Sequence, residues 1–163
     1  MLVARRINQG PPRQPQRHFA FLSFRWETGS DLARVIHAEF LALGMHSYFD
    51  LQHIRASRFD EKMLLEIERA ANFILILGPG ALDRCADPAD WLRQETAHAI
   101  RTERNVVPIL MQGFRFPEPH QVPSDLAELP RYNCVQHSPS YLGATLDKLL
   151  AFCSITRPPG VQP

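Results

Sequence analysis

The sequence predicts an α/β fold in which a parallel β-sheet of five strands is flanked by helices. Short apolar segments alternate along the chain with segments whose apolar residues recur at helical spacing. Residues 72–77, Asn-Phe-Ile-Leu-Ile-Leu, are apolar on both faces, which is typical of a strand in the middle of a covered sheet. Strands that alternate with helices through short connections imply a parallel sheet covered on both faces.

Turn and cap residues divide the chain into these elements. The first strand, 18–24, ends at Arg-Trp-Glu-Thr-Gly, and Ser30 is expected to cap a helix that Gly44 closes. Gly78-Pro79-Gly80 ends the middle strand and is interpreted as a turn rather than a phosphate-binding nest. The other strands are predicted at 45–49, 105–111 and 132–135, and the other helices at 59–71, 91–103 and 141–152.

The flavodoxin-like, doubly wound strand order 2-1-3-4-5 is the one expected for this alternation. In such folds ligands bind beyond the carboxyl ends of the strands, where the strand order reverses. The residues expected around this crevice are Phe24, Arg25, Asp50, Gly78 and Gln112. The loop before Trp91 opens on the same rim.

Length and composition indicate one domain with tails. At 163 residues and 45% hydrophobic content, the chain is long enough for one substantial core. Residues 1–17 are predicted to be a disordered Arg/Pro-rich tail, 18–153 the folded domain, and 154–163 a flexible tail. A net charge of +1 gives no case for binding nucleic acid or a membrane.

The cysteines and histidines indicate neither a disulfide framework nor a metal site. The three cysteines form no close pair, and the seven histidines are scattered, so no metal is predicted and a reducing cytoplasm fits best. No apolar run approaches the roughly 18 residues of a membrane span, and no apolar segment follows the basic N-terminus. We therefore expect a cytoplasmic protein.

Several chemistries that are common on this architecture are not supported. Neither a G-x-G-x-x-G motif nor a P-loop occurs, so hydrolysis of nucleoside triphosphates is not indicated. The first strand ends Ser23-Phe24-Arg25, without the paired acidic residues that a response regulator needs. Arg25, Trp26 and Glu27 are too bulky for the phosphate loop of a flavodoxin. Ser23 lacks the nucleophile-elbow context of a hydrolase triad.

Trp91 and Glu95 form the most informative pair in the chain. Their i, i+4 spacing puts both side chains on one helical face. An indole can stack on a flat cationic ring while a carboxylate one turn away faces the group bonded to that ring. Nicotinamide is such a ring, and it leaves its ribose as a neutral molecule. The alternative interpretation is a tryptophan that anchors the core and a solvated glutamate.

Five segments carry a family resemblance over nearly all of 18–153. They read Phe-Leu-Ser-Phe-Arg at 21–25, Tyr-Phe-Asp at 48–50, Phe-Ile-Leu-Ile-Leu-Gly-Pro-Gly-Ala-Leu-Asp-Arg-Cys at 73–85, Asp-Trp-Leu-Arg-Gln-Glu at 90–95 and Gly-Phe-Arg-Phe-Pro at 113–117. In this order they resemble the Toll/interleukin-1 receptor (TIR) domain family. The first resembles its first-strand box and the second its BB-loop segment. The third and fourth resemble most closely the NAD-cleaving branch, of bacterial type.

The resemblance implies roles for individual residues. Glu95 aligns with the catalytic glutamate, and Trp91 with an aromatic residue that can stack on the base. Phe24 and Arg25 occupy positions near the nicotinamide pocket, and Asp50 lies at the root of the BB loop. For Arg25 a loop-stabilising salt bridge and a substrate-positioning role both remain open.

Some positions depart from the family pattern or have other expected roles. In the BB loop Arg55 replaces an acidic residue and Ser57 a glycine, and Phe24 replaces a tyrosine in the first box. Phe116 stands where the family often has tryptophan, and we count it among the substrate-binding residues. Cys85 is expected to be a small buried residue. His98 is expected to face solvent.

The resemblance implies an NAD+ glycohydrolase that releases nicotinamide and either ADP-ribose or a cyclic ADP-ribose isomer. NAD+ is then the substrate, and no cofactor is expected. A neighbouring subunit's BB loop completes the site in related enzymes, so activity is expected to depend on self-association, with other TIR domains or an upstream sensor as further partners and a role in prokaryotic immunity. The alternative is a non-enzymatic docking module, motivated by the short chain and the altered BB loop.

Overall fold

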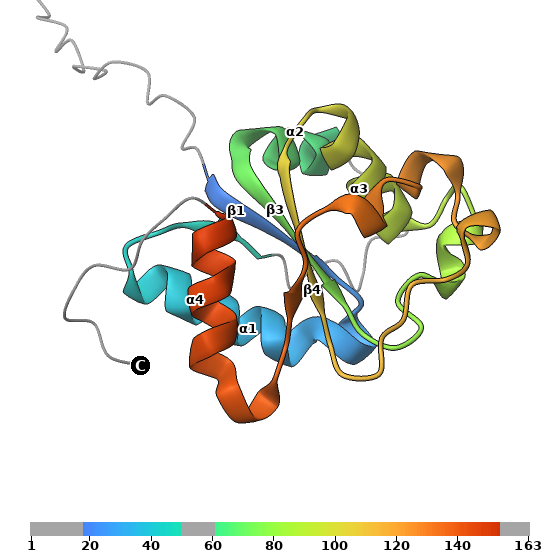
Figure 1. Cartoon of the computed structure of the whole chain (residues 1–163). Coiled ribbons are helices and arrows are strands. Elements are labelled where there is room, and N and C mark those ends of the chain that lie inside the picture. The colour runs from blue at the N-terminus through green and yellow to red at the C-terminus, as the bar shows by residue number, and fades with distance from the viewer. Residues whose placement is uncertain (1–17, 50–60, 154–163) are drawn as a thin grey trace, which may run out of the picture.

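The computed structural model describes residues 18–49 and 61–153 (Figure 1). Within this part of the chain five parallel strands form one sheet in the order β2-β1-β3-β4-β5. The strands are β1 (His18–Phe24), β2 (Ser47–Tyr48), β3 (Ala70–Leu77), β4 (Asn105–Leu110) and β5 (Val135–Gln136). The predicted fold class and strand order are confirmed.

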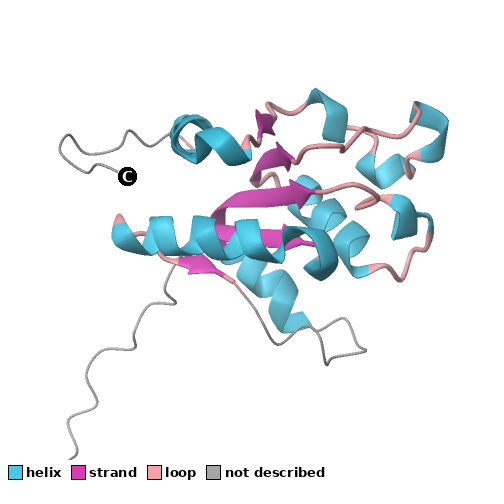
Figure 2. Cartoon of the chain, turned by 90° about the horizontal axis from the view of Figure 1, so that it is seen from below, coloured by secondary structure: helices cyan, strands magenta, loops and turns pink. Residues whose placement is uncertain are grey.

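Four α-helices and several short 3-10 helices connect the described strands. The α-helices are α1 (Trp26–Ala42), α2 (Glu61–Arg69), α3 (Trp91–Arg101) and α4 (Leu142–Phe152). The 3-10 helices are η2 (Asp83–Ala86), η3 (Pro119–Gln121), η4 (Ser124–Leu126), η5 (Leu129–Arg131) and η6 (Pro139–Tyr141). Figure 2 shows helices on both sides of the strands. None of the helices in 18–49 and 61–153 has the length and apolarity that crossing a bilayer would require.

The core consists of two layers, one on each face of the sheet, and β3 contributes to both. Ile74 and Ile76 pack with residues of α1 and α4, whereas Phe73 and Leu75 pack with residues of α2 and α3. All four side chains are fully buried. This double burial explains why 72–77 is apolar on both faces.

The first helix starts earlier than predicted, at Trp26 rather than after Ser30. The backbone amides of Thr28 and Gly29 already donate to the carbonyl of Arg25. A Cβ on Gly29 would lie 2.8 Å from the Cβ of Phe24, so only glycine lets this first turn lie so close to the sheet. Only Arg25 therefore separates the end of β1 from the start of α1. Its end at Gly44, which has a φ of 75°, agrees with the prediction.

Other boundaries also differ from the prediction. The last strand is at Val135–Gln136 instead of 132–135, because Leu129–Arg131 forms a 3-10 helix that contains Pro130. The second helix ends at Arg69, and 70–71 already belong to β3. The predicted start of that helix at 59 lies outside the described residues.

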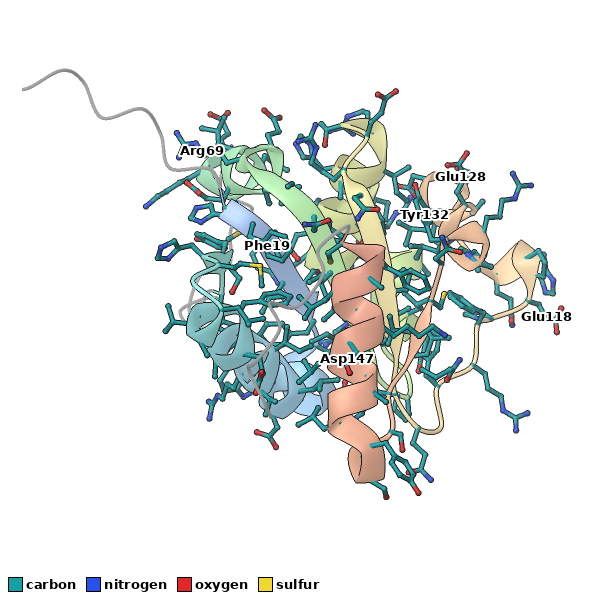
Figure 3. All side chains as sticks on the ribbon, turned by 60° about the vertical axis from the view of Figure 1, so that its left-hand side comes forward. Phe19, Arg69, Glu118, Glu128, Tyr132 and Asp147 are labelled. Atoms are coloured by element: carbon teal, nitrogen blue, oxygen red, sulfur yellow. The ribbon has the colours of Figure 1, made fainter. Side chains whose placement is uncertain are left out.

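The amino-terminal end of the sheet carries an ionic cluster around a buried glutamate, Glu66. Glu66 on α2 accepts hydrogen bonds from His18 of β1 and from Arg69, both at 2.7 Å. Arg69 lies near the beginning of β1 in Figure 3. The cluster therefore ties α2 to the first strand at the end of the sheet opposite the candidate crevice.

Candidate active site

A cavity of about 470 Å³ opens where the carboxyl ends of β1 and β2 meet the start of α3. Its described lining consists of residues 21–27, Tyr48, Arg84, residues 89–91 and Glu95. The volume falls within the range of small-molecule sites, about 300–1,000 Å³. The cavity lies at the end of the sheet where the strand order predicted a ligand crevice.

Asp90 determines where α3 begins. Its side chain accepts a hydrogen bond of 3.1 Å from the backbone amide of Arg93, and a residue that does this in front of a helix stabilises the first turn. Trp91 then follows as the first helical residue, and Glu95 lies one turn further along the same face. Both residues line the cavity. Because the Asp90 cap sets the residue at which α3 begins, it also sets where the indole and the carboxylate lie along the cavity wall.

Glu95 is only 4% exposed although it carries a carboxylate. Its Oε2 accepts a hydrogen bond of 2.6 Å from the hydroxyl of Ser23, which is itself buried. Ser23 lies on β1 two residues after Phe21, and side chains two apart on a strand share one face. Phe21 packs in the layer beneath α2 and α3, so the Ser23 hydroxyl meets Glu95 from the sheet side.

Arg25 and Asp90 form a bidentate ion pair at the rim of the cavity. The two terminal nitrogens of Arg25 donate to the two carboxylate oxygens of Asp90 at 2.7 and 2.8 Å, and its Nε donates to the carbonyl of Ala81 at 2.9 Å. The guanidinium is buried and is engaged on both of its edges. The geometry therefore corresponds to the loop-stabilising salt bridge, one of the two roles that the sequence left open for Arg25.

The ion pair also sets the ionisation of its members. Burial alone would raise the pKa of Asp90, but the hydrogen bonds from Arg25 and from the Arg93 amide outweigh it, so the pKa lies below its usual value. Burial lowers the pKa of Arg25, but Asp90 more than offsets this effect and the pKa is raised. Asp90 is consequently a fixed anion at neutral pH.

Cys85 lies against this ion pair. It is buried, as the sequence predicted, and its Sγ is 3.5 Å from an oxygen of Asp90. Burial, together with the nearby charge of Asp90, raises the pKa of the Cys85 thiol to about 12. The side chain is therefore a protonated thiol that packs against the ion pair of Arg25 and Asp90.

The remaining predicted site residues have different positions. Phe24 lines the cavity and stacks on Phe49, with 5.6 Å between ring centroids. Phe116 is not part of the described lining; it packs edge-to-face on Phe114 in the layer of α2 and α3. Asp50, like the other BB-loop positions Arg55 and Ser57, lies outside the described residues.

The expectation that His98 faces solvent was wrong. This side chain is 6% exposed, and its ring nitrogens contact Glu68 of α2 at 3.0 Å and Arg101 at 2.7 Å. The reason is that α3 packs against α2, so the face of α3 that carries His98 is covered. The imidazole ring of His98 therefore joins α3 to α2 through its contact with Glu68.

Sequence reasoning missed Ser23 and the paired role of Asp90. The strand alternation offered a signal for Ser23, because a hydroxyl at a core-facing position needs a buried partner. For Asp90 the signal was its place directly before Trp91, where an acidic residue can cap a helix. Within 18–49 and 61–153 no group of three or more His, Cys, Asp or Glu side chains has a geometry that could hold a metal ion.

A comparison with known families identifies this architecture. The family model described as "TIR domain" matches residues 20–150, most of the chain. The chain belongs to the TIR domain family. The resemblance found in the sequence is thereby confirmed for the whole of this TIR domain rather than for its motifs alone.

Curated relatives of this TIR domain are named NAD(+) hydrolases. The zebrafish (Danio rerio) protein "NAD(+) hydrolase SARM1" is 35% identical over 142 residues, which are 85% of this chain and 20% of that protein. The Drosophila melanogaster protein "NAD(+) hydrolase sarm1" is 34% identical over 135 residues, 81% of this chain and 10% of that protein. The chain thus spans a fifth or less of the length of these two relatives.

Solved structures share the fold at lower identity. A TIR-STING receptor from C. gigas, solved in complex with 2',3'-cGAMP, superposes with a TM-score of 0.60 at 18% identity and covers 88% of this chain and 41% of its own. The TIR domain of the Toll-related receptor TRR-2 from Hydra magnipapillata has a TM-score of 0.56 at 14% identity and covers 84% and 98%. These likenesses extend the agreement to the arrangement of strands and helices.

Proposed function

We propose that this TIR domain is an NAD+ glycohydrolase in which Glu95 is the catalytic carboxylate. The observation that carries the proposal is a buried glutamate in the wall of a cavity, with Trp91 one helical turn away on the same wall. The names of the relatives that are 34% and 35% identical support the same substrate.

The chemistry of NAD+ explains how one carboxylate is enough. Ordinary glycoside hydrolysis uses two carboxyl groups, one of which protonates the leaving oxygen. Nicotinamide leaves ribose as a neutral molecule and needs no proton, so the main task is to stabilise an oxocarbenium-like sugar. A fixed anion in a site that excludes water does this effectively. Asp90, the other carboxylate near the helix start, is neutralised by Arg25 and is not a proton donor.

The neighbouring residues support the substrate around this carboxylate. Trp91 stacks on the nicotinamide ring, and Phe24 forms part of the wall near it. Arg25 acts through Asp90, because the pair sets the position of α3. Roles for Asp50 and Phe116 in substrate binding rest on the family resemblance and stay predictions.

The proposal also covers the reaction product, the self-association of the protein and its biological role. Water would capture the ribosyl cation to give ADP-ribose, whereas a group of the same nucleotide would give a cyclic isomer. We propose that self-association through TIR–TIR contacts activates the enzyme, so the specific activity should rise with protein concentration. We also propose, from the resemblance, that the protein acts in prokaryotic immunity.

The direct test is nicotinamide release from NAD+ by concentrated purified protein, followed by chromatography. Glu95→Gln keeps the size of the side chain and removes its charge, so we expect release to fall by about 10²–10³-fold, as when one electrostatic stabiliser is removed. Circular dichroism and the urea midpoint provide the folding control.

Two outcomes would contradict the proposal in different ways. Release that is unchanged in the Glu95→Gln protein would exclude Glu95 as the catalyst. No release by the wild type at any concentration, with a cellular phenotype that persists in Glu95→Ala, would favour a non-enzymatic TIR docking module.

A further inference from the structure

Two arginines belong to the described lining of the cavity, and they differ in how they are held. Arg25 is buried and makes three hydrogen bonds to Asp90 and Ala81, so it has little capacity left for a ligand. Arg84, on η2, has a side chain that is 61% exposed. The exposed arginine is therefore the better candidate for contact with a charged ligand.

Within the described residues, Arg84 has one weak partner, Glu27 of α1. Its NH2 lies 3.4 and 3.5 Å from the two oxygens of Glu27, whose side chain is 65% exposed. These distances exceed the roughly 2.7–2.9 Å of a good charge-assisted hydrogen bond. Exposed ion pairs of this kind contribute little to stability and exchange easily for another partner.

The backbone under Arg84 is firmly held. A terminal nitrogen of Arg93 donates to the carbonyls of Cys85 and Ala86, both at 3.2 Å, and Arg93 itself pairs with Asp125. The 3-10 turn that carries Arg84 is thereby attached to the start of α3. A fixed backbone lowers the cost of ordering a site on binding, and the exposed guanidinium is accessible to a ligand.

We propose that Arg84 forms a phosphate subsite of this cavity, which binds the pyrophosphate of a dinucleotide, and that Glu27 is the carboxylate that competes with the phosphate for Arg84. The proposal rests on the proposed function, because it assigns part of the same substrate. The planar fork of arginine matches two phosphate oxygens. A bound phosphate would replace Glu27 as the partner of Arg84.

The pairing predicts opposite effects for its two members. Arg84→Gln removes the cation, so we expect the KM for NAD+ to rise about tenfold, as for one lost charge-assisted contact. Glu27→Gln removes the competitor and a repulsive charge, so we expect KM to fall about twofold to threefold. The matched control is Arg131→Gln, which makes the same charge change at an exposed position outside the described lining.

A phosphate-free substrate separates binding of phosphate from a structural effect. Nicotinamide riboside has the scissile bond of NAD+ without the pyrophosphate, so its kcat/KM should be the same in Arg84→Gln and in the wild type. Raising the salt concentration should increase the KM for NAD+ in the wild type more than in Arg84→Gln. If Arg84→Gln lost kcat/KM equally for NAD+ and for nicotinamide riboside, the proposed phosphate subsite would be excluded, whereas the proposed function would still hold.

Titration calorimetry with ADP-ribose decides the subsite without turnover. We expect ADP-ribose to bind Arg84→Gln about tenfold more weakly than the wild type or Arg131→Gln. Equal affinity in all three proteins, or no binding by the wild type at millimolar ligand, would overturn the proposal. If the wild type binds ADP-ribose through Arg84 but releases no nicotinamide from NAD+, the proposed function fails and the phosphate subsite holds.

Discussion

Two buried glutamates lie at opposite ends of the sheet, and they have different surroundings. Glu66, at the amino-terminal end, is 6% exposed and has His18 and Arg69 on its two oxygens. Glu95, at the carboxyl end, is 4% exposed, accepts a hydrogen bond from the neutral hydroxyl of Ser23 and lines a cavity. Burial of a carboxylate is common to both, so burial alone does not identify a site.

The two ends of the sheet differ in two respects: whether the glutamate lines a cavity, and whether a separate ion pair supports the helix that carries it. We call the ion pair of Arg25 and Asp90 at the start of α3 the frame of the cavity. The Glu66 cluster links α2 to β1 and is not part of the described cavity lining. At the other end the ion pair of Arg25 and Asp90 supports the helix start, and the carboxylate on the next turn faces the cavity. One end thus uses its charges to join elements, and the other uses one ion pair to position a separate carboxylate.

The largest effect that we expect on stability comes from breaking the frame at the cavity. Asp90→Ala leaves the Arg25 guanidinium buried without its carboxylate and removes the cap of α3. Removal of one partner of a buried pair costs about 3–5 kcal/mol, so urea unfolding should show a loss of this size. A loss below about 1 kcal/mol, the level of an exposed pair, would contradict the framing role.

Acid should weaken the same frame. Because the folded-state pKa of Asp90 is lowered, its contribution to stability is complete above the unfolded-state pKa of about 3.9 and is lost as the pH falls through the folded-state value. Asp90→Asn keeps a good capping residue and removes the charge, so it should cost about 2–3 kcal/mol at neutral pH. The difference between the wild-type and Asp90→Asn unfolding free energies should shrink below about pH 4. A difference that stays constant down to pH 2 would exclude this titration.

A smaller effect is expected at the opposite end of the sheet. Glu66→Gln weakens the contacts to His18 and to the half-exposed Arg69, so we expect a loss of about 1–2 kcal/mol in the free energy of unfolding. The kcat for NAD+ should remain at the wild-type level, because Glu66 lies outside the described lining of the cavity. Loss of turnover in a folded Glu66→Gln protein would remove the contrast between the two glutamates.

The sequence was sufficient for features that depend on local pattern. The apolar run of β3 predicted its central place, and the i, i+4 spacing of Trp91 and Glu95 predicted that they share one face. Contacts between distant segments were less accessible. Ser23 and Glu95 are 72 positions apart, and the environment of His98 depends on the packing of α2 against α3. The start of α1 depends on how closely Gly29 approaches the sheet, which no periodicity reveals.

The smallest stability effect is expected for Ser23, where the contrast between the two glutamates can be refined. Ser23→Ala removes the neutral donor to Glu95, which should cost about 1 kcal/mol of stability and about a tenfold loss of kcat, because the carboxylate is no longer held in one orientation. Thr96→Val is the matched control on the same helix, since the buried Thr96 hydroxyl has no hydrogen-bond partner among the described residues. Its replacement should leave kcat unchanged and stability within about 1 kcal/mol of the wild type. If both variants lost turnover equally, a general disturbance of α3 would explain the loss, and the Ser23 hydrogen bond would have no separate role in orienting Glu95.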